Sequence, residues 1–526
     1  MKTSKSIIFT LLFTIILASC NMDKYPYDKI PLESAIESFA DCQKLRTGMY
    51  RDLRIIAVST NVLAAEIQAD GFLPLSYFGN QLGALYRWEA NASESTFSTI
   101  WSNSYVTIAQ CNLLIEGIKR LQTEGKFSDS ELPTVKNYLG EAHLIRAIAY
   151  SILVDKFCAT YDPATAENFY GVPIVDEYSP SADNTKYPSR ATLAATYSFI
   201  KDDIKQAKEN MTATGQHSFE YLSTDALTAF EARIALLTKD YDTAIDCAEG
   251  LIKDGRYPLI NNAAQMQEMW CNDVSTEVIC QLFSSKQELA PAMGNYFLDE
   301  TNHKPVFLPS RDIINSFREN DIRVNCYFKM EDISFSTNEK HRLAVFTKYP
   351  GNPEMYEGVN NYVNKPKIFR IAEQYLIAAE AYYMRGEGED ELAAYDVLYE
   401  LMYARDASIF NPVSGLSLRH LIRAEREREL YGEGFRLTDL KRYGEGFKRQ
   451  NPQSVQLSYE LGMDLNIKAD NTRWLWAIPK AEQMPIRRLS INKTRVINFI
   501  QKEKYDYELS ETICNIAFAT YYDSLQ

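Results

Sequence analysis

The chain has 526 residues, of which 46% are hydrophobic and 24% are charged, and this composition is typical of a globular protein with enough apolar side chains for a large core. Its formal net charge is -14. Because so acidic a chain has no excess of cations to neutralise a run of phosphates, nucleic acid is excluded as an expected partner.

The N-terminus has the features of an export signal. Lys2 and Lys5 precede an apolar run over residues 7–17, which is too short to span a bilayer core about 30 Å thick. We therefore expect a signal peptide over residues 1–19. The Leu-Ala-Ser-Cys sequence that ends at Cys20 resembles the lipobox of bacterial lipoproteins, whose cysteine carries acyl chains such as palmitate. The polar residues 20–37 would then be a lipidated tether, and the alternative is an ordinary signal peptide with an incidental cysteine.

Helical periodicity dominates the chain from about residue 38. Apolar residues recur at steps of three and four in residues 101–117 and 139–155, and we expect these two segments to pair as helices. A helical hairpin is indicated over residues 224–252, where alanine at every third position lets two antiparallel helices approach closely. A second hairpin spans residues 370–406, and both resemble degenerate tetratricopeptide units.

Two segments interrupt this pattern. Residues 71–91 and 266–358 are rich in Gly, Pro, Asn and aromatic residues and lack a sustained helical period, which indicates long loops with short strands. We predict a mostly α fold in which one domain, residues 38–526, combines about four tetratricopeptide-like pairs with these loop-rich inserts. Long irregular segments in compact proteins are commonly functional, so ligand contacts are expected there.

Aromatic side chains in these loops are the candidate binding residues. Their rings offer rigid faces on which a sugar ring or a peptide side chain can stack, and packing within the loops is the alternative for each of them. The candidates are Tyr77, Phe78, Tyr86 and Trp88 in the first segment, and Trp270, Tyr296 and Phe297 in the second.

Signatures of catalysis are missing from the sequence. There is no GxSxG, HExxH or CxxC motif, and the five histidines are far apart. We therefore expect no catalytic residue, no metal and no cofactor. Cys271 and Cys280 are the closest pair among the cysteines after Cys20, but their pairing cannot be deduced from the sequence.

Residues 418–446 contain an apolar helical stripe that turns ionic midway. Charged side chains are rarely buried unless they are paired, so this stripe indicates either a partly buried ion network or a solvated helical face. The residues proposed for a structural network are Glu425, Arg426, Glu429, Arg436, Asp439 and Arg442.

These charged residues also carry a resemblance to the SusD/RagB family of Bacteroidetes-type lipoproteins, which extends over essentially the whole mature chain. Earlier matches include Trp101, Asn112, Gly140-Glu141-Ala142 and Arg370. The most distinctive matches are Glu425-Arg426, Glu429-Leu430, Glu433-Gly434, Arg436, Asp439-Leu440 and Arg442.

The resemblance implies a lipid-anchored outer-membrane protein that faces the cell exterior and captures a nutrient for a TonB-dependent, SusC-like transporter barrel. The nutrient is usually a glycan and sometimes a peptide, and no ligand residue is shared across the family. We therefore expect a glycan-binding lipoprotein that is not an enzyme and that delivers oligosaccharides to such a transporter. The alternatives are a peptide-binding member of the family and a helical scaffold that binds only protein partners.

Overall fold

The structure is a computed structural model that describes residues 36–58, 60–179, 186–298, 304–336, 339–407, 414–449 and 451–482. The predicted signal peptide, the lipidation site Cys20 and most of the predicted tether lie outside these ranges, as does Cys514. Within the described ranges, no helix has both the length and the apolar character that crossing a bilayer requires.

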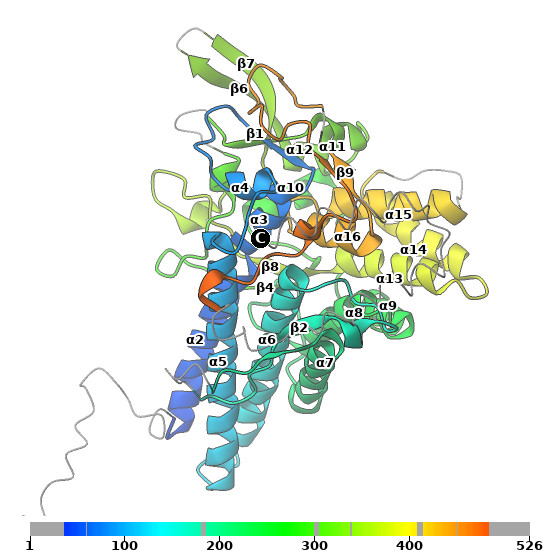
Figure 1. Cartoon of the computed structure of the whole chain (residues 1–526). Helices are drawn as coiled ribbons and strands as arrows, with labels where there is room; N and C mark the ends of the chain where they lie inside the picture. The colour runs from blue at the N-terminus through cyan, green and yellow to red at the C-terminus, as the bar shows by residue number, and fades with distance from the viewer. Residues whose placement is uncertain are drawn as a thin grey trace, which may run out of the picture.

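Long helices pack side by side in the first part of the chain (Figure 1). Helix α2 (Phe39–Ala57) lies against α5 (Ser95–Thr123) and α6 (Leu132–Phe157), and α6 packs in turn against α7 (Leu193–Asn210). The two periodic segments predicted to pair therefore do so, as α5 and α6. The prediction of a mostly α fold is confirmed.

Two further helical pairs continue the array. They are α8 (Thr224–Leu237) with α9 (Tyr241–Asp254), and α13 (Ile371–Arg385) with α14 (Asp390–Ala404). The predicted alanine stripe of α8 is buried, and its second half, Ala232 and Ala235, packs with alanines of α9 and α13 in one cluster. Asp240 caps α9 by accepting a hydrogen bond from the backbone N–H of Thr243, and Gly386 ends α13 in the left-handed conformation with φ 68°.

Shorter elements make up the loop-rich half. They are α3 (Thr60–Gln68), β1 (Phe72–Pro74), α4 (Gly83–Tyr86), α10 (Ala263–Cys271), β5 (Phe307–Pro309), α11 (Arg311–Ser316), α12 (Val324–Tyr327), β6 (Phe328–Ser336) and β7 (Glu339–Phe346). Strand β1 pairs with β5, and β6 with β7, both antiparallel. Aromatic side chains dominate the core between these elements, which differs in this respect from the alanine-rich helical interfaces.

The β6–β7 hairpin is longer than the short strands predicted for this segment, and it projects from the top of the molecule in Figure 1. Along β7 the first residues are largely exposed, whereas the last four are buried. A strand that is exposed at one end and buried at the other lacks the alternating apolar pattern by which strands are recognised. The hairpin was therefore not evident from periodicity.

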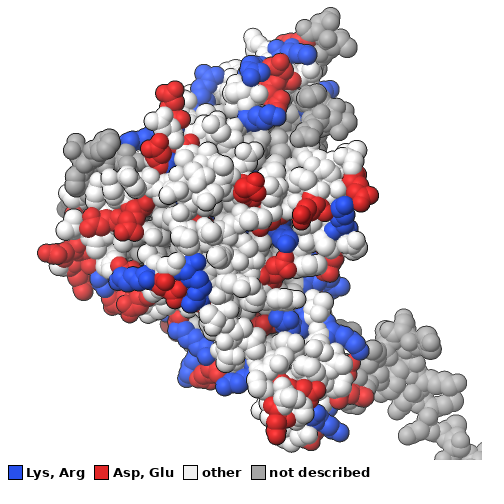
Figure 2. Space-filling view, turned by 180° about the vertical axis from the view of Figure 1, so that it is seen from behind, with Lys and Arg blue, Asp and Glu red and all other residues white. Residues whose placement is uncertain are grey.

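Further strands and helices complete the fold. They are β2 (Tyr170–Pro173) paired with β3 (Arg190–Thr192), β4 (Val278–Gln281) paired with β8 (Lys367–Arg370), α15 (Gly415–Glu429), α16 (Arg436–Tyr443), and β9 (Phe447–Lys448) paired with β10 (Asn466–Ile467). The described cysteines are free thiols, including Cys271 and Cys280. Acidic side chains gather on the left in Figure 2. Because that view is turned by 180°, this is the side that lies on the right in Figure 1, where α13 and α14 are.

Candidate functional site

A cavity of about 520 Å³ lies in the loop-rich half. Its wall is formed by α10, α12, the β6–β7 hairpin and residues near Phe297. This volume is within the range of roughly 300 to 1,000 Å³ that is usual for small-molecule sites. The cavity is therefore large enough for a ligand of one or a few sugar rings.

Helix α10 contributes one wall of this cavity. The helix begins after Asn262, whose side chain accepts a hydrogen bond from the backbone N–H of Gln265 at 2.9 Å. Gln267, Trp270 and Cys271 follow at steps of three and four, so they share the face of α10 that lines the cavity. Sequence periodicity thus explains why these three residues lie together.

Strand β6 contributes a second wall. Lys329, Glu331 and Ile333 alternate along the strand and therefore point to the same face, which lines the cavity. The Lys329 ammonium lies 2.6 Å from a Glu331 carboxylate oxygen, so the two charges neutralise each other. With Asn325 and Thr347 they offer polar groups that suit a ligand rich in hydroxyls rather than a strongly charged one.

A close backbone contact positions the segment 294–297, which forms the third wall of the cavity. A Cβ atom at Gly294 would lie 2.1 Å from the carbonyl oxygen of Tyr349, so only glycine fits where the two segments meet. The short 3₁₀ helix Gly294–Tyr296 follows this contact, and Phe297 comes directly after it. Phe297 packs against Phe72 and Phe346 and completes the cavity wall.

Two of the seven predicted aromatic residues, Trp270 and Phe297, line this cavity. Their exposed fractions are only 2% and 1%, so their rings are part of the wall and have little open face. The ammonium of Lys348 lies 4.5 Å from the centre of a Trp270 ring, and that of Lys367 lies 5.2 Å away. Cations therefore occupy part of the surface that we expected a ligand to use.

Three other candidates are enclosed in the core elsewhere. Phe78 packs against Tyr459, and Tyr86 lies beneath the guanidinium of Arg449 at 3.9 Å. Trp88 donates a hydrogen bond from its indole nitrogen to the carbonyl of Gln68 at 2.7 Å and is 2% exposed. Buried rings such as these fill the core between irregular segments and offer no open platform to a ligand.

The last two candidates are half-buried. The Tyr77 hydroxyl donates a hydrogen bond to the carbonyl of Pro305 at 3.0 Å. The Tyr296 ring lies 6.4 Å from that of Phe307. Both rings retain some exposed surface, and Pro305 itself lines the cavity. A contact of Tyr77 or Tyr296 with a ligand stays a prediction.

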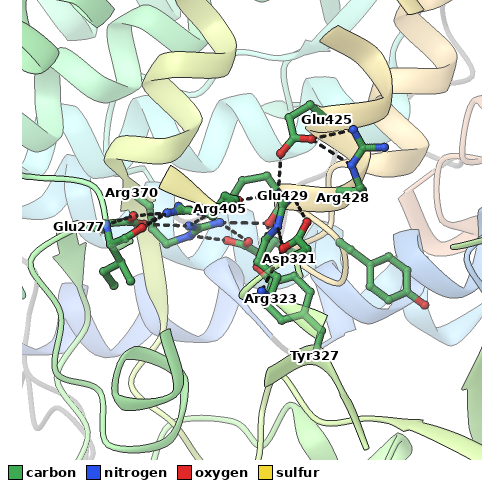
Figure 3. Close-up of polar contacts among 12 residues, drawn as sticks. Glu277, Asp321, Arg323, Tyr327, Arg370, Arg405, Glu425, Arg428 and Glu429 are labelled. Atoms are coloured by element: carbon green, nitrogen blue, oxygen red, sulfur yellow. Dashed lines mark hydrogen bonds and ion pairs between the residues drawn. The ribbon is translucent and has the colours of Figure 1, made fainter. Parts of the chain in front are cut away.

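The charged stripe of residues 418–446 lies inside the protein. The buried residues of α15 are Leu418, Ile422, Glu425, Arg426 and Glu429, which is the stripe predicted from the helical repeat. We call the group formed by Glu277, Asp321, Arg323, Arg370, Arg405, Glu425 and Glu429 the Glu429 cluster (Figure 3).

Glu429 is at the centre of this cluster. Its carboxylate lies 2.9 Å from guanidinium nitrogens of Arg323 and Arg370, and 3.0 Å from Arg405. Burial alone would raise the pKa of Glu429, but the three guanidiniums outweigh burial and hold that pKa well below its usual value. Every one of these four side chains is 2% exposed or less. Glu429 therefore stays ionised inside the core.

The other predicted network residues also form ion pairs, in two smaller groups. The Arg426 Nε donates to Asp439 at 2.8 Å, and Arg442 bridges Asp439 and Glu380. Arg436 pairs with Asp70 at 2.7 Å. The spacing along α15 and α16 predicted which charges turn inward. The other members of the Glu429 cluster, such as Arg323, Arg370 and Glu277, could not be predicted from spacing. Each of these three is at least 59 residues from Glu429 in the chain.

The fold and this site together define a class of protein in which paired helices carry a loop-built cavity suited to a small polar ligand. Two family models match this chain. The first, described as "Starch-binding associating with outer membrane", matches residues 22–236, and the second, described as the SusD family, matches residues 315–493. The chain belongs to the SusD/RagB family.

Similar proteins agree with this assignment. A SusD-like protein of Formosa agariphila is 22% identical over 507 residues, which cover 86% of this chain and 94% of the relative. A SusD superfamily structure from Bacteroides thetaiotaomicron is 23% identical, with a TM-score of 0.73 over 86% of this chain and 99% of the other. A structure described as a SusD-like carbohydrate binding protein from Bacteroides vulgatus has a TM-score of 0.71 and 16% identity, covering 86% and 98%.

Proposed function

We propose that this protein is a glycan-binding lipoprotein of the outer membrane that passes oligosaccharides to a TonB-dependent transporter and catalyses no reaction. The observation that carries this proposal is the cavity of about 520 Å³ lined by Gln267, Asn325, Lys329, Glu331 and Thr347. Paired charges and amides match the many hydroxyls of an uncharged sugar, while Trp270 and Phe297 add apolar edges.

Calorimetric titration tests the ligand class. We expect saturable heat with oligosaccharides, at modest affinity that improves with chain length, because each sugar unit adds contacts. Saturable heat with peptide digests alone would identify a peptide binder, and no heat with either would favour a protein-binding scaffold. Release of product from a labelled oligosaccharide would contradict the absence of catalysis.

Substitutions in the cavity test the site. Gln267→Ala and Asn325→Ala should each weaken oligosaccharide binding by about tenfold, which is about 1.4 kcal/mol. Both side chains are exposed, so thermal stability should not change. Gln265→Ala is the matched control, because Gln265 is on the same helix but does not line the cavity. Equal affinity for all variants would exclude the cavity as the binding site.

Membrane attachment and partner choice need separate tests. Cys20→Ala should move the protein from the membrane fraction to the soluble fraction if the cysteine is acylated. Co-expression with a transporter encoded beside it should yield a complex that survives purification. A protein that is still in the membrane fraction after Cys20→Ala would contradict the lipid anchor.

A further inference from the structure

Two thiols line the cavity of about 520 Å³. Cys271 is the last residue of α10, and Cys326 lies on α12. These two helices pack against each other in the loop-rich half (Figure 1). Both thiols are free, so the cavity brings together two unbonded cysteines that are far apart in the chain.

The sulfur of Cys326 lies beside the last turns of α10. Its Sγ–H donates a hydrogen bond to the carbonyl oxygen of Met266 at 3.7 Å. Carbonyl groups of an α-helix point toward its C-terminal end, which in α10 is Cys271. The helical rise of about 1.5 Å per residue places Cys271 roughly 7.5 Å beyond Met266 along the axis. Cys326 thus faces the part of α10 that carries the other thiol.

The two thiols also influence each other electrostatically. Burial is the main reason that the pKa of Cys326 is raised, to about 12. The Cys271 thiol contributes to this rise, because two negative sulfurs would repel each other, while Lys348 and Lys367 act in the opposite direction. Such an influence requires the two sulfur atoms to be near each other, which agrees with the position of Cys326 against α10.

The neighbour of Cys271 in the sequence, Cys280, faces elsewhere. Cys280 lies on β4 in the core formed with the long helices, and its thiol donates to the carbonyl of Tyr221 at 3.5 Å. Cys326 instead belongs to the aromatic core of the loop-rich half. The pair that is closest in the sequence is therefore separated in the fold, and Cys326 is the better partner for Cys271.

We propose that Cys271 and Cys326 form a disulfide on oxidation, which joins α10 to α12 and fixes two walls of the cavity. The predicted export signal would place the chain in a compartment where disulfides persist. The bond forms whether or not the cavity binds a sugar, so this inference does not rest on the proposed function.

The oxidant is a small-molecule disulfide such as oxidised glutathione. Cys271 reacts first, because it is half-buried at the cavity wall, whereas Cys326 is only 8% exposed. The Cys271 thiolate attacks one sulfur of the reagent and expels a glutathione thiolate. The Cys326 thiolate then attacks the Cys271 sulfur and expels the second one. Two electrons pass to the reagent, and the two protons lost by the cysteines are taken up by the glutathione thiolates.

Mass spectrometry of the full protein tests the bond. The reaction is run at pH 8.5, because burial and the nearby Glu268 and Asp273 raise the pKa of Cys271. We expect the mass to fall by about 2 Da and a tryptic digest without reductant to link residues 257–286 to residues 324–329. No link, or glutathione that stays on Cys271, would overturn the proposal.

Single substitutions identify the sulfurs that are joined. Cys271→Ala and Cys326→Ala should each abolish the link. Cys280→Ala is the matched control, because Cys280 is in the same tryptic peptide as Cys271, and it should keep the link. A link that persists in Cys271→Ala but is lost in Cys280→Ala would assign the bond to Cys280 and overturn the proposal.

Thermal unfolding provides a second measurement. The disulfide closes a loop of about 55 residues and so restricts the unfolded chain, which should raise the unfolding midpoint by about 4 °C. Dithiothreitol should remove this rise. Cys271→Ala should have the same midpoint with and without the oxidant, and that midpoint also verifies that the variant folds. A rise of equal size in Cys271→Ala would show that another pair of cysteines is responsible.

Discussion

The helical pairs and the loop-rich half fill their cores in different ways. Between α8, α9 and α13 the buried side chains are mainly alanines such as Ala232, Ala248 and Ala378, which let helices approach closely. In the loop-rich half, large rings such as Phe72 and Phe346 fill the space between irregular segments. Regular elements can be packed with small residues, whereas irregular ones need large side chains to exclude water.

An ionic junction links these two regions. Arg323 belongs to the loop-rich half, Arg405 follows α14, and Glu429 ends α15, yet all three meet in the Glu429 cluster. Substitutions can therefore test how each region is stabilised. They are placed at the junction, in the aromatic core, at a buried carboxyl group and at a helical interface.

Removing the central charge should have the largest effect. Glu429→Gln leaves Arg323, Arg370 and Arg405 buried with one carboxylate fewer, and should lower the free energy of unfolding by about 3 to 5 kcal/mol. Urea denaturation measures this loss. The exposed Glu460 offers a control in Glu460→Gln, which should be nearly neutral. A loss below about 1 kcal/mol would mean that the cluster does not join the two regions.

A buried ring of the first loop segment should matter almost as much. Trp88→Ala removes a ring that packs against Trp474 and Phe447, and should cost about 3 to 5 kcal/mol of stability. Tyr296→Ala should cost less, because Tyr296 is half-buried. Thermal and urea unfolding compare the two variants. An unfolding midpoint for Trp88→Ala equal to that of the unchanged protein would contradict its role in the core.

A buried carboxyl group makes stability depend on pH. Burial raises the pKa of Glu66 to about 7, despite a hydrogen bond from the N–H of Gly434 at 2.6 Å and the nearby Lys348. In the unfolded chain Glu66 ionises near pH 4.5, so its contribution to stability is present below that pH and is lost as the pH rises to about 7. Glu66→Gln should remove this loss and raise stability at pH 8 by on the order of 2 kcal/mol.

The measurement for Glu66 is urea denaturation at several pH values. The variant and the unchanged protein should differ little at pH 4 and most at pH 8. Glu460→Gln again serves as the control. A difference that is constant over the whole pH range would show that ionisation of Glu66 is not responsible.

Enlarging an alanine at a helical interface should have the smallest effect. Ala378→Leu forces a larger side chain between α9 and α13, and should cost about 1 to 3 kcal/mol. Ala393→Leu is the matched control on α14, because Ala393 is only half-buried. Thermal unfolding distinguishes the two. If both substitutions are tolerated equally, close approach of the helices is not what the alanines provide.

The helical part of this protein could be predicted from its sequence. Apolar repeats predicted the pairs α5–α6, α8–α9 and α13–α14, because a helix that buries one face must repeat its apolar residues every three to four positions. The same repeat predicted that Glu425 and Glu429 turn inward. These features depend on spacing within one element, which the sequence records directly.

Contacts between distant parts of the chain became evident only from the structure. The sequence could not indicate that Arg323 lies against Glu429, or that Trp88 is buried while Gln267 lines a cavity. From the sequence, every aromatic residue in the loops was an equal candidate for ligand binding, because a ring has the same chemistry on the surface and in a core. Partner choice, and burial in segments without a regular repeat, arise from contacts between residues far apart in the chain, and no local pattern encodes them.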